Sequence, residues 1–328
     1  MTPKTEDFFL KFKSGIGQGL IKGWKGFVWL LKILIPISFA TALLVHYGVI
    51  YKLDFLLTPV MAWLSLPASA ALVLMIGLFT GIYGTVAALS VMPFSVDQMT
   101  LIAIFTLISH NIIQESIVQG NSGMNAVFAA VYRIFTAFLV TFICARLMGV
   151  ALDPGDAGSV GHLVQETKPF TAMIRSWGWG TLKLAVQIFC IIMPLMVTME
   201  LAKLFHIITF ITRITSPLLS VMGLSRSTGM LWLTATIFGL AYGAAVMVEE
   251  TKSNEYKKED LTRLHLSIGI NHSMVEDPAL FLPLGLPIFW LWIPRLVAAV
   301  MVTWLYSVYS SARRVHAERA VHKKLCDH

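Results

Sequence analysis

Two apolar stretches of this sequence each hold a histidine close to a carboxylate. They read Ser109-His110-Asn111-Ile112-Ile113-Gln114-Glu115-Ser116 and Asn271-His272-Ser273-Met274-Val275-Glu276-Asp277-Pro278. In each case an arginine follows the histidine at the same distance, since 133 − 110 = 23 and 295 − 272 = 23. An ionisable group in hydrocarbon is costly unless it is paired or hydrated, so it marks a functional site by default. A histidine–acid–arginine set that occurs twice therefore predicts a duplicated functional site.

The composition predicts that the surrounding solvent is lipid. The chain has 328 residues, of which 56% are hydrophobic and only 13% charged, and its mean hydropathy is +0.74. A soluble domain is about 25% charged, and several apolar runs here reach the roughly 20 residues that cross a bilayer as a helix. We therefore expect an all-α, multi-pass membrane protein.

The basic residues lie mainly at the two ends of the chain. The net charge of +7 reflects lysines within residues 1–25 and arginines and lysines within residues 311–328. In a membrane protein this distribution predicts cytoplasmic termini and gives no reason to expect a nucleic-acid partner. We expect residues 1–25 to form an amphipathic segment at the membrane surface and residues 311–328 to form a basic cytoplasmic tail.

The two halves of the chain share landmarks in the same order. These landmarks are Pro36 and Pro194, Pro59 and Pro217, Tyr83-Gly84 and Tyr242-Gly243, His110 and His272, and Arg133 and Arg295. Their offsets rise only from 158 to 162 residues, as small insertions in loops would produce. The sequence therefore predicts an internal repeat, with one copy in residues 26–150, the other in residues 170–310, and an external linker in residues 151–169.

Each repeat contains about five apolar segments that can be transmembrane or re-entrant helices. In the first repeat they cover residues 26–48, 50–66, 67–92, 98–118 and 124–149, and in the second 181–203, 205–224, 228–248, 262–281 and 286–309. An odd number of crossings would place the two repeats in opposite orientations. The distribution of charges agrees with opposite orientations, because they place the basic loop 249–263 on the cytoplasmic side of the membrane and the acidic linker on the external side. Two inverted repeats are an architecture of secondary transporters, with the site where the repeats meet.

Helical spacing makes specific predictions about the two histidine stretches. Residues four apart share one face of a helix, so His110 should lie beside Gln114 and His272 beside Glu276. Pro278 should end or break the second helix near Asp277. The candidate site residues are His110, Asn111, Gln114, Glu115, Arg133, Asn271, His272, Glu276, Asp277 and Arg295.

The chemistry of these side chains leaves several roles open. Histidines with carboxylates can carry protons, and His110, Glu115, His272, Glu276 and Asp277 could bind a divalent metal ion. The arginines could bind a carboxylate or phosphate group of a substrate. The structural alternative is that Arg133 pairs with Glu115, and Arg295 with Glu276 or Asp277.

The two stretches resemble those of the nucleoside-recognition, or Gate, domain family of membrane proteins. The resemblance rests on His110-Asn111 through Glu115 and on Asn271-His272 through Glu276-Asp277. It implies a polytopic permease of the bacterial inner membrane, without establishing a nucleoside substrate. Related segments occur in concentrative nucleoside transporters and in the bacterial ferrous-iron transporter, whose GxxxxGKS-type nucleotide switch is missing from this sequence.

Together these features predict a secondary transporter, coupled to protons, that moves a small polar or anionic solute by alternating access. One alternative is transport of a divalent metal ion, and another is a non-transporting membrane subunit of an envelope assembly. We do not expect an enzyme, because the sequence has no HExxH motif and no serine with a plausible base. The expected partners are the lipid bilayer, the solute, proton or metal ion, and a possible second copy of the chain. The additional acid and the proline of Glu276-Asp277-Pro278 favour the second repeat as the coupling half.

Overall fold

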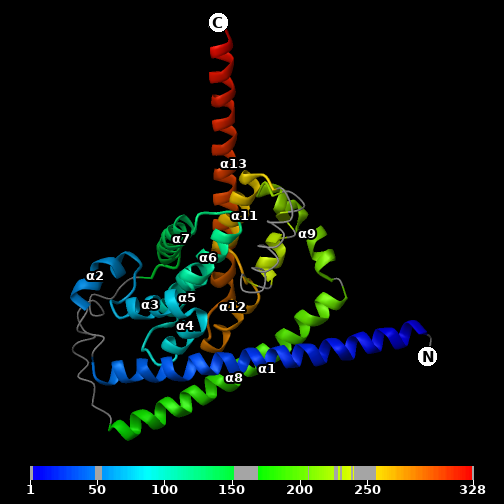
Figure 1. Cartoon of the computed structure of the whole chain (residues 1–328). Helices are drawn as coiled ribbons and strands as arrows, with labels where there is room; N and C mark the ends of the chain where they lie inside the picture. Colours follow the sequence, from blue (N-terminus) through cyan, green and yellow to red (C-terminus); the bar gives the residue numbers. More distant parts are fainter. Residues whose placement is uncertain are drawn as a thin grey trace.

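The computed structural model describes residues 3–48, 54–150, 169–205, 207–224, 228–229, 231–237, 239 and 256–326. Within these residues the regular secondary structure is entirely helical (Figure 1). All but the last residue of the predicted linker 151–169, and most of the predicted segment 228–248, including Tyr242-Gly243, lie outside the described residues. The prediction of an all-α protein is confirmed for the part of the chain that the structure describes.

Two long helices, α1 (Pro3–His46) and α8 (Phe170–Leu204), pack side by side below the bundle in Figure 1. Gly19 allows α1 and α8 to approach each other closely, because a methyl group on this residue would collide with the backbone of Val197 in α8. Lys22 of α1 forms an ion pair of 2.8 Å with Glu200 of α8. Helix α1 shows no break between residues 25 and 26, so the predicted amphipathic segment is the first part of a longer helix.

The described residues of the rest of the first half form six shorter helices around a buried centre. They are α2 (Asp54–Trp63), α3 (Ala70–Thr80), α4 (Ile82–Leu89), α5 (Val96–Ser109), α6 (Ile112–Asn121) and α7 (Ala126–Leu147). Helix α5 begins with a capping box, in which the side chain of Ser95 accepts from the backbone of Gln98 and that of Gln98 accepts from the backbone of Ser95. Every residue from Thr100 to Ser109 is buried. Helix α5 is therefore the innermost helix of this half.

The second half continues with shorter helices and one long one. They are α9 (Ile207–Val221), α11 (Lys258–Ile270), α12 (Glu276–Ala279), the 3₁₀-helix η2 (Leu282–Leu284) and α13 (Ile288–Cys326). The end of α13 projects well beyond the bundle (Figure 1). The predicted basic tail thus continues a membrane-length helix as far as Cys326.

Within the described residues, five helical stretches are long and apolar enough to cross a membrane. They are Phe9–His46, Val96–Asn121, Ala126–Leu147, Phe170–Ala202 and Ile288–Arg313. Many of their large apolar side chains are exposed, for example those of Phe135, Trp179 and Leu182. Such a surface is unfavourable in water and suits contact with lipid chains.

Candidate functional site

Both predicted histidine helices break at the histidine itself. Helix α5 ends at Ser109, and the next two residues leave the helical path, with His110 extended and Asn111 left-handed (φ 46°, ψ 41°). In the second half α11 ends at Ile270, and Ser273 has a φ of 48°. The prediction that each histidine shares a helical face with the residue four positions later is therefore wrong. The predicted end near Pro278 is also wrong, because Pro278 lies inside the short helix α12.

Each break is held by a backbone hydrogen bond to a neighbouring helix. Asn111 donates its N–H to the carbonyl of Gly77 at 3.3 Å, and Ser273 donates to the carbonyl of Ala235 at 3.1 Å. Non-helical backbone at membrane depth persists only where it is buried or lines a cavity. These hydrogen bonds satisfy the backbone N–H groups of Asn111 and Ser273 inside the protein.

Two glycines make room for the residue after each histidine. Gly81 (φ 84°) separates α3 from α4, and a methyl group on it would lie 2.7 Å from the side-chain nitrogen of Asn111. Gly239 (φ 77°) similarly lies against the side chain of Ser273. The predicted segment 67–92 is therefore two helices joined at Gly81. A glycine inside an apolar segment was the only sequence signal of this joint.

Arg133 binds the end of α5 and one carboxylate. Its Nε donates to the carbonyl of Ile108 at 3.0 Å and its Nη2 to the carbonyl of His110 at 2.9 Å. These carbonyls need partners because the last carbonyls of a helix have none within it. Nη2 also lies 2.5 Å from Oε2 of Glu115. The predicted pairing of Arg133 with Glu115 is confirmed.

Arg295 makes the same backbone contacts in the second half. Its Nε donates to the carbonyl of Ile270 at 3.2 Å and its Nη2 to the carbonyl of His272 at 2.7 Å. Among the described residues it forms no ion pair with Glu276 or Asp277, so that predicted pairing is wrong. Both arginines are fully buried and outside the cavity lining, where they support the backbone that carries the histidines.

The two histidine rings are oriented in the same way. Nδ1 of His110 lies 3.1 Å from the carbonyl of Thr106, and Nδ1 of His272 lies 2.8 Å from the carbonyl of Ile268. A carbonyl oxygen only accepts hydrogen bonds, so each Nδ1 carries a hydrogen. Each Nε2 then faces Glu115. Nε2 of His110 lies 3.0 Å from Oε1 of Glu115, and Nε2 of His272 lies 3.2 Å from Oε2.

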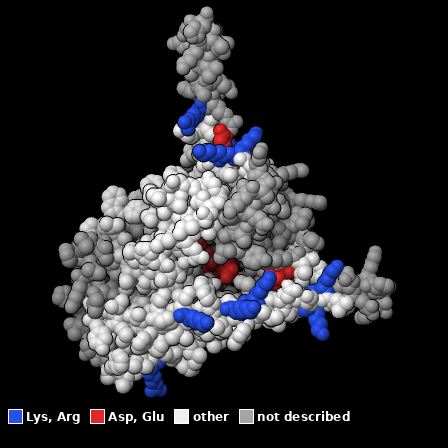
Figure 2. Space-filling view, viewed as in Figure 1, with Lys and Arg blue, Asp and Glu red and all other residues white. Residues whose placement is uncertain are grey.

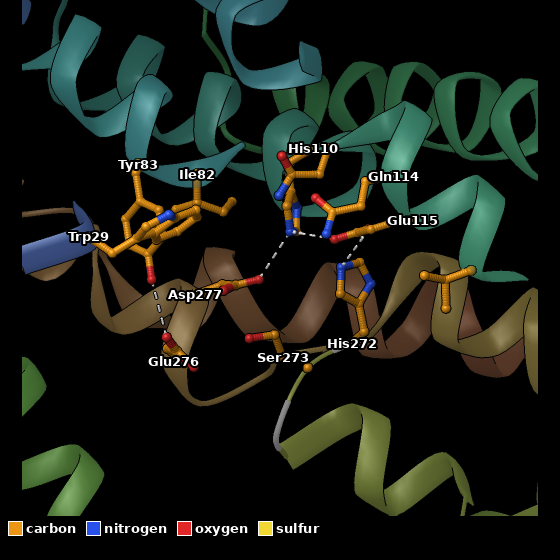
Figure 3. Close-up of a pocket in the computed structure, with 13 residues that line it drawn as sticks. Trp29, Ile82, Tyr83, His110, Gln114, Glu115, His272, Ser273, Glu276 and Asp277 are labelled. Atoms are coloured by element: carbon orange, nitrogen blue, oxygen red, sulfur yellow. Dashed lines mark hydrogen bonds and ion pairs between the residues drawn. The ribbon is translucent and has the colours of Figure 1, made fainter. Parts of the chain in front are cut away.

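Asp277 completes the cluster from the second half of the chain. Its Oδ2 lies 3.4 Å from Nε2 of His110, and the rings of His110 and His272 have their centroids 4.9 Å apart. Figure 3 shows the groups of the two halves facing one another, with Glu115 between the imidazoles. Two carboxylates and two imidazole nitrogens therefore converge on one small volume.

The cluster forms one end of a cavity of about 270 Å³. Most of the predicted site residues line it, namely His110, Asn111, Gln114, Glu115, His272, Glu276 and Asp277. Asn271, like the two arginines, is buried outside the lining, and neither polar atom of its side chain has a hydrogen-bond partner within the described residues. The lining residues that the sequence did not single out for the site are Trp29, Ile82, Tyr83, Val118, Gly239 and Ser273.

An aromatic pair occupies the other end of the cavity. The hydroxyl of Tyr83 donates to Oε1 of Glu276 at 3.3 Å, and the ring of Trp29 meets that of Tyr83 edge to face at 5.1 Å. Glu276 therefore points toward Tyr83 and away from His272 (Figure 3). The only sequence signal for Tyr83 was its place in the Tyr-Gly landmark.

The wall of the cavity carries acidic and imidazole groups. Among the described residues it includes three carboxylates, those of Glu115, Glu276 and Asp277, and no lysine or arginine. Figure 2 shows acidic groups in a hollow near the middle of this face, with a row of basic groups on the surface below it. Such a wall attracts cations and repels anions.

Comparison with known proteins supports the membrane assignment. The chain is similar to the uncharacterised membrane protein YvoD of Bacillus subtilis (strain 168), with 27% identity over 296 residues that cover 89% of this chain and 92% of YvoD. No protein-family model and no solved structure matches the chain. The similarity covers nearly the whole length of both proteins. This chain is a helical membrane protein.

Proposed function

We propose that this membrane protein is a secondary transporter that moves a small cation or polar solute by alternating access. The observation that carries the proposal is the shared orientation of His110 and His272. Both have Nδ1 tied to a backbone carbonyl and Nε2 directed at the same carboxylate, Glu115. A lone pair on Nε2 would repel a carboxylate oxygen, so each contact calls for a hydrogen or a cation between the two atoms.

An inverted repeat would explain why these contacts occur in both halves. The arginine contacts lie at the same spacing in each, because 133 − 108 = 25 and 295 − 270 = 25. The backbone contacts behind the breaks are also matched, since 235 − 77 = 158 and 239 − 81 = 158. Duplicated broken helices that meet at one site are typical of secondary transporters. We further propose a bacterial inner-membrane location with cytoplasmic termini, and membership of the Gate domain family.

The charges of the site favour a cationic or neutral solute over an anionic one. Arg133 and Arg295 lie outside the cavity lining and direct Nε and Nη2 to backbone carbonyls and, for Arg133, to Glu115, while Nη1 of each has no hydrogen-bond partner within the described residues. The lining offers carboxylates instead. The predicted anion-binding role of the arginines therefore has no support from their positions, whereas proton coupling and cation transport both fit a site that needs a positive partner.

Flux into proteoliposomes tests this proposal. The full-length protein should move Co²⁺, a polar organic cation or protons, measured with fluorescent reporters inside the vesicles. Glu115→Gln should abolish that flux because it removes the carboxylate shared by the two histidines. Asp97→Asn is the matched control, since Asp97 is an exposed carboxylate at the start of α5, far along the helix from its broken end. Equal flux in the Glu115→Gln variant and the wild type, or no flux in any of the proteins, would overturn the proposal.

One observation favours the alternative of a membrane subunit in an envelope assembly. Helix α13 extends well beyond the bundle (Figure 1), where a partner could bind it. This alternative predicts that removal of residues 311–328 abolishes function in cells, and that His110→Ala and His272→Ala do not.

A further inference from the structure

We propose that the histidine cluster is a binding site for one divalent transition-metal ion. The ligands are Nε2 of His110, Nε2 of His272 and the carboxylate of Asp277, with Glu115 as the fourth. Binding of the metal stands on this geometry alone. The further step, that the metal is the transported solute, rests on the proposed function.

The spacing of the ligand atoms suits a small ion. One ligand atom from each of His110, His272 and Asp277 lies within 4.8 Å of the others. Ligands about 2.1 Å from a tetrahedral metal lie about 3.4 Å from each other. The distance from Nε2 of His110 to Oδ2 of Asp277 is 3.4 Å, and Glu115 lies 3.0 Å and 3.2 Å from the two imidazoles. Small side-chain adjustments therefore suffice to surround an ion.

The groups behind the ligands have the arrangement that metal sites use. A metal-bound histidine almost always donates its other ring N–H to a carbonyl or carboxylate, which fixes the ring and its tautomer. His110 and His272 both do so, to Thr106 and Ile268. Arg133 holds both the backbone of His110 and the carboxylate of Glu115. The ligands are therefore oriented before any ion arrives.

Besides Oε2 of Glu115, which is ion-paired with Arg133, two buried atoms of the cluster lack a hydrogen-bond partner. They are Nε2 of His272 and Oδ2 of Asp277, and neither makes a hydrogen bond within the described part of the chain. The residue His272 is only 1% exposed. Buried polar atoms in native proteins usually have partners. Both atoms face the same centre, so one ion there would satisfy both.

The donor set selects the class of metal. Two imidazoles and two carboxylates suit zinc, ferrous iron, cobalt or manganese, whereas calcium and magnesium prefer oxygen ligands throughout. Neither Cys144 nor Cys190 lines the cavity, so the described part of the lining offers no thiolate for copper(I). A proton or an organic ammonium ion is the competing occupant, and either would give no metal binding.

Titration with Co²⁺ tests the inference, because tetrahedral Co²⁺ bound to nitrogen and oxygen has strong visible absorption. Full-length protein in lipid nanodiscs should bind one Co²⁺ per chain, and Zn²⁺ but not Mg²⁺ should displace it. Asp277→Asn and His272→Ala should each weaken Co²⁺ binding at least tenfold, while Asp97→Asn should not. Thermal melts identify any variant that has failed to fold, and Asp277→Asn is the conservative change for that reason.

The outcomes separate the metal from the function. A folded wild-type protein without saturable Co²⁺ binding, or an Asp277→Asn variant that binds like the wild type, overturns the metal site. If proteoliposomes then still carry protons or a polar solute, the proposed transport function survives. Co²⁺ binding without any flux would support the site and count against transport.

Discussion

His110 and His272 lie ring to ring, with centroids 4.9 Å apart, although 272 − 110 = 162 residues separate them. Each is placed by the same contacts, namely a carbonyl four residues earlier that holds Nδ1 and an arginine 23 residues later that holds the backbone. The two halves therefore present matched imidazole nitrogens to one shared carboxylate. This relationship is the basis of the predictions that follow.

The two arginines should differ in their effect on stability. Arg133→Leu would leave Glu115 buried without its guanidinium partner, which typically costs about 3–5 kcal/mol. Arg295→Leu removes two backbone hydrogen bonds but no ion pair recorded in the structure, so it should lower the free energy of unfolding by less. Apparent melting temperatures in detergent measure the difference. An Arg295→Leu variant that is the less stable of the two would contradict this account of Glu115.

Gly81 should tolerate no side chain. Gly81→Ala forces a residue with a β-carbon to a φ of 84° and against Asn111, so we expect a loss of about 1–3 kcal/mol. Gly178→Ala is the matched control, because the site in α8 has open space around it and alanine favours a helix by up to about 1 kcal/mol. Melting temperatures that fall equally for both variants would argue against a special role for the joint between α3 and α4.

Tyr83 should influence transport more than stability. Tyr83→Phe removes the hydroxyl that donates to Glu276 at 3.3 Å and frees this carboxylate inside the cavity, so we expect altered flux or altered selectivity among cations. Tyr132→Phe is the control, since its hydroxyl donates to the carbonyl of Leu266 at 2.9 Å and Tyr132 does not line the cavity. Unchanged flux and selectivity in Tyr83→Phe would exclude the tyrosine from the site.

The two histidines should be energetically coupled. Because both contact Glu115, the effects of His110→Ala and His272→Ala should not add, with a coupling of about 0.5–3 kcal/mol. A double-mutant cycle on the free energy of unfolding measures it. The pair His110→Ala and His46→Ala, which share no recorded partner, should add. Additive effects for both pairs would mean that the shared carboxylate does not link the histidines.

Much of the site follows from the sequence, because costly polar groups in apolar segments have few reasons to be there. The duplicated histidines and acids do meet, and Arg133 does pair with Glu115. Periodicity could not reveal where the helices break, since the left-handed conformations of Asn111 and Ser273 depend on Gly77, Ala235 and other residues far away in the sequence. The helix-face predictions for Gln114 and Glu276 failed for that reason.

The other features that the sequence did not predict also depend on tertiary contacts. Trp29 reaches the cavity from α1, and Tyr83 from α4, and no local pattern records that these helices meet there. Arg295 pairs with backbone carbonyls because a helix ends beside it, which the count of charged residues could not reveal. Helix α1 continues past residue 25 and packs against α8, a contact that no local pattern predicts.

Access to Gln114 from the two sides of the membrane tests the central claim most directly. Gln114 lines the cavity, so a Gln114→Cys variant, with Cys144, Cys190 and Cys326 replaced by serine, reports on the site. Alternating access predicts that a membrane-impermeant thiol reagent labels this cysteine from either side of a sealed vesicle, and that saturating Co²⁺ changes the ratio of the two rates. Labelling from one side only, unchanged by Co²⁺ or by any transported solute, would contradict it.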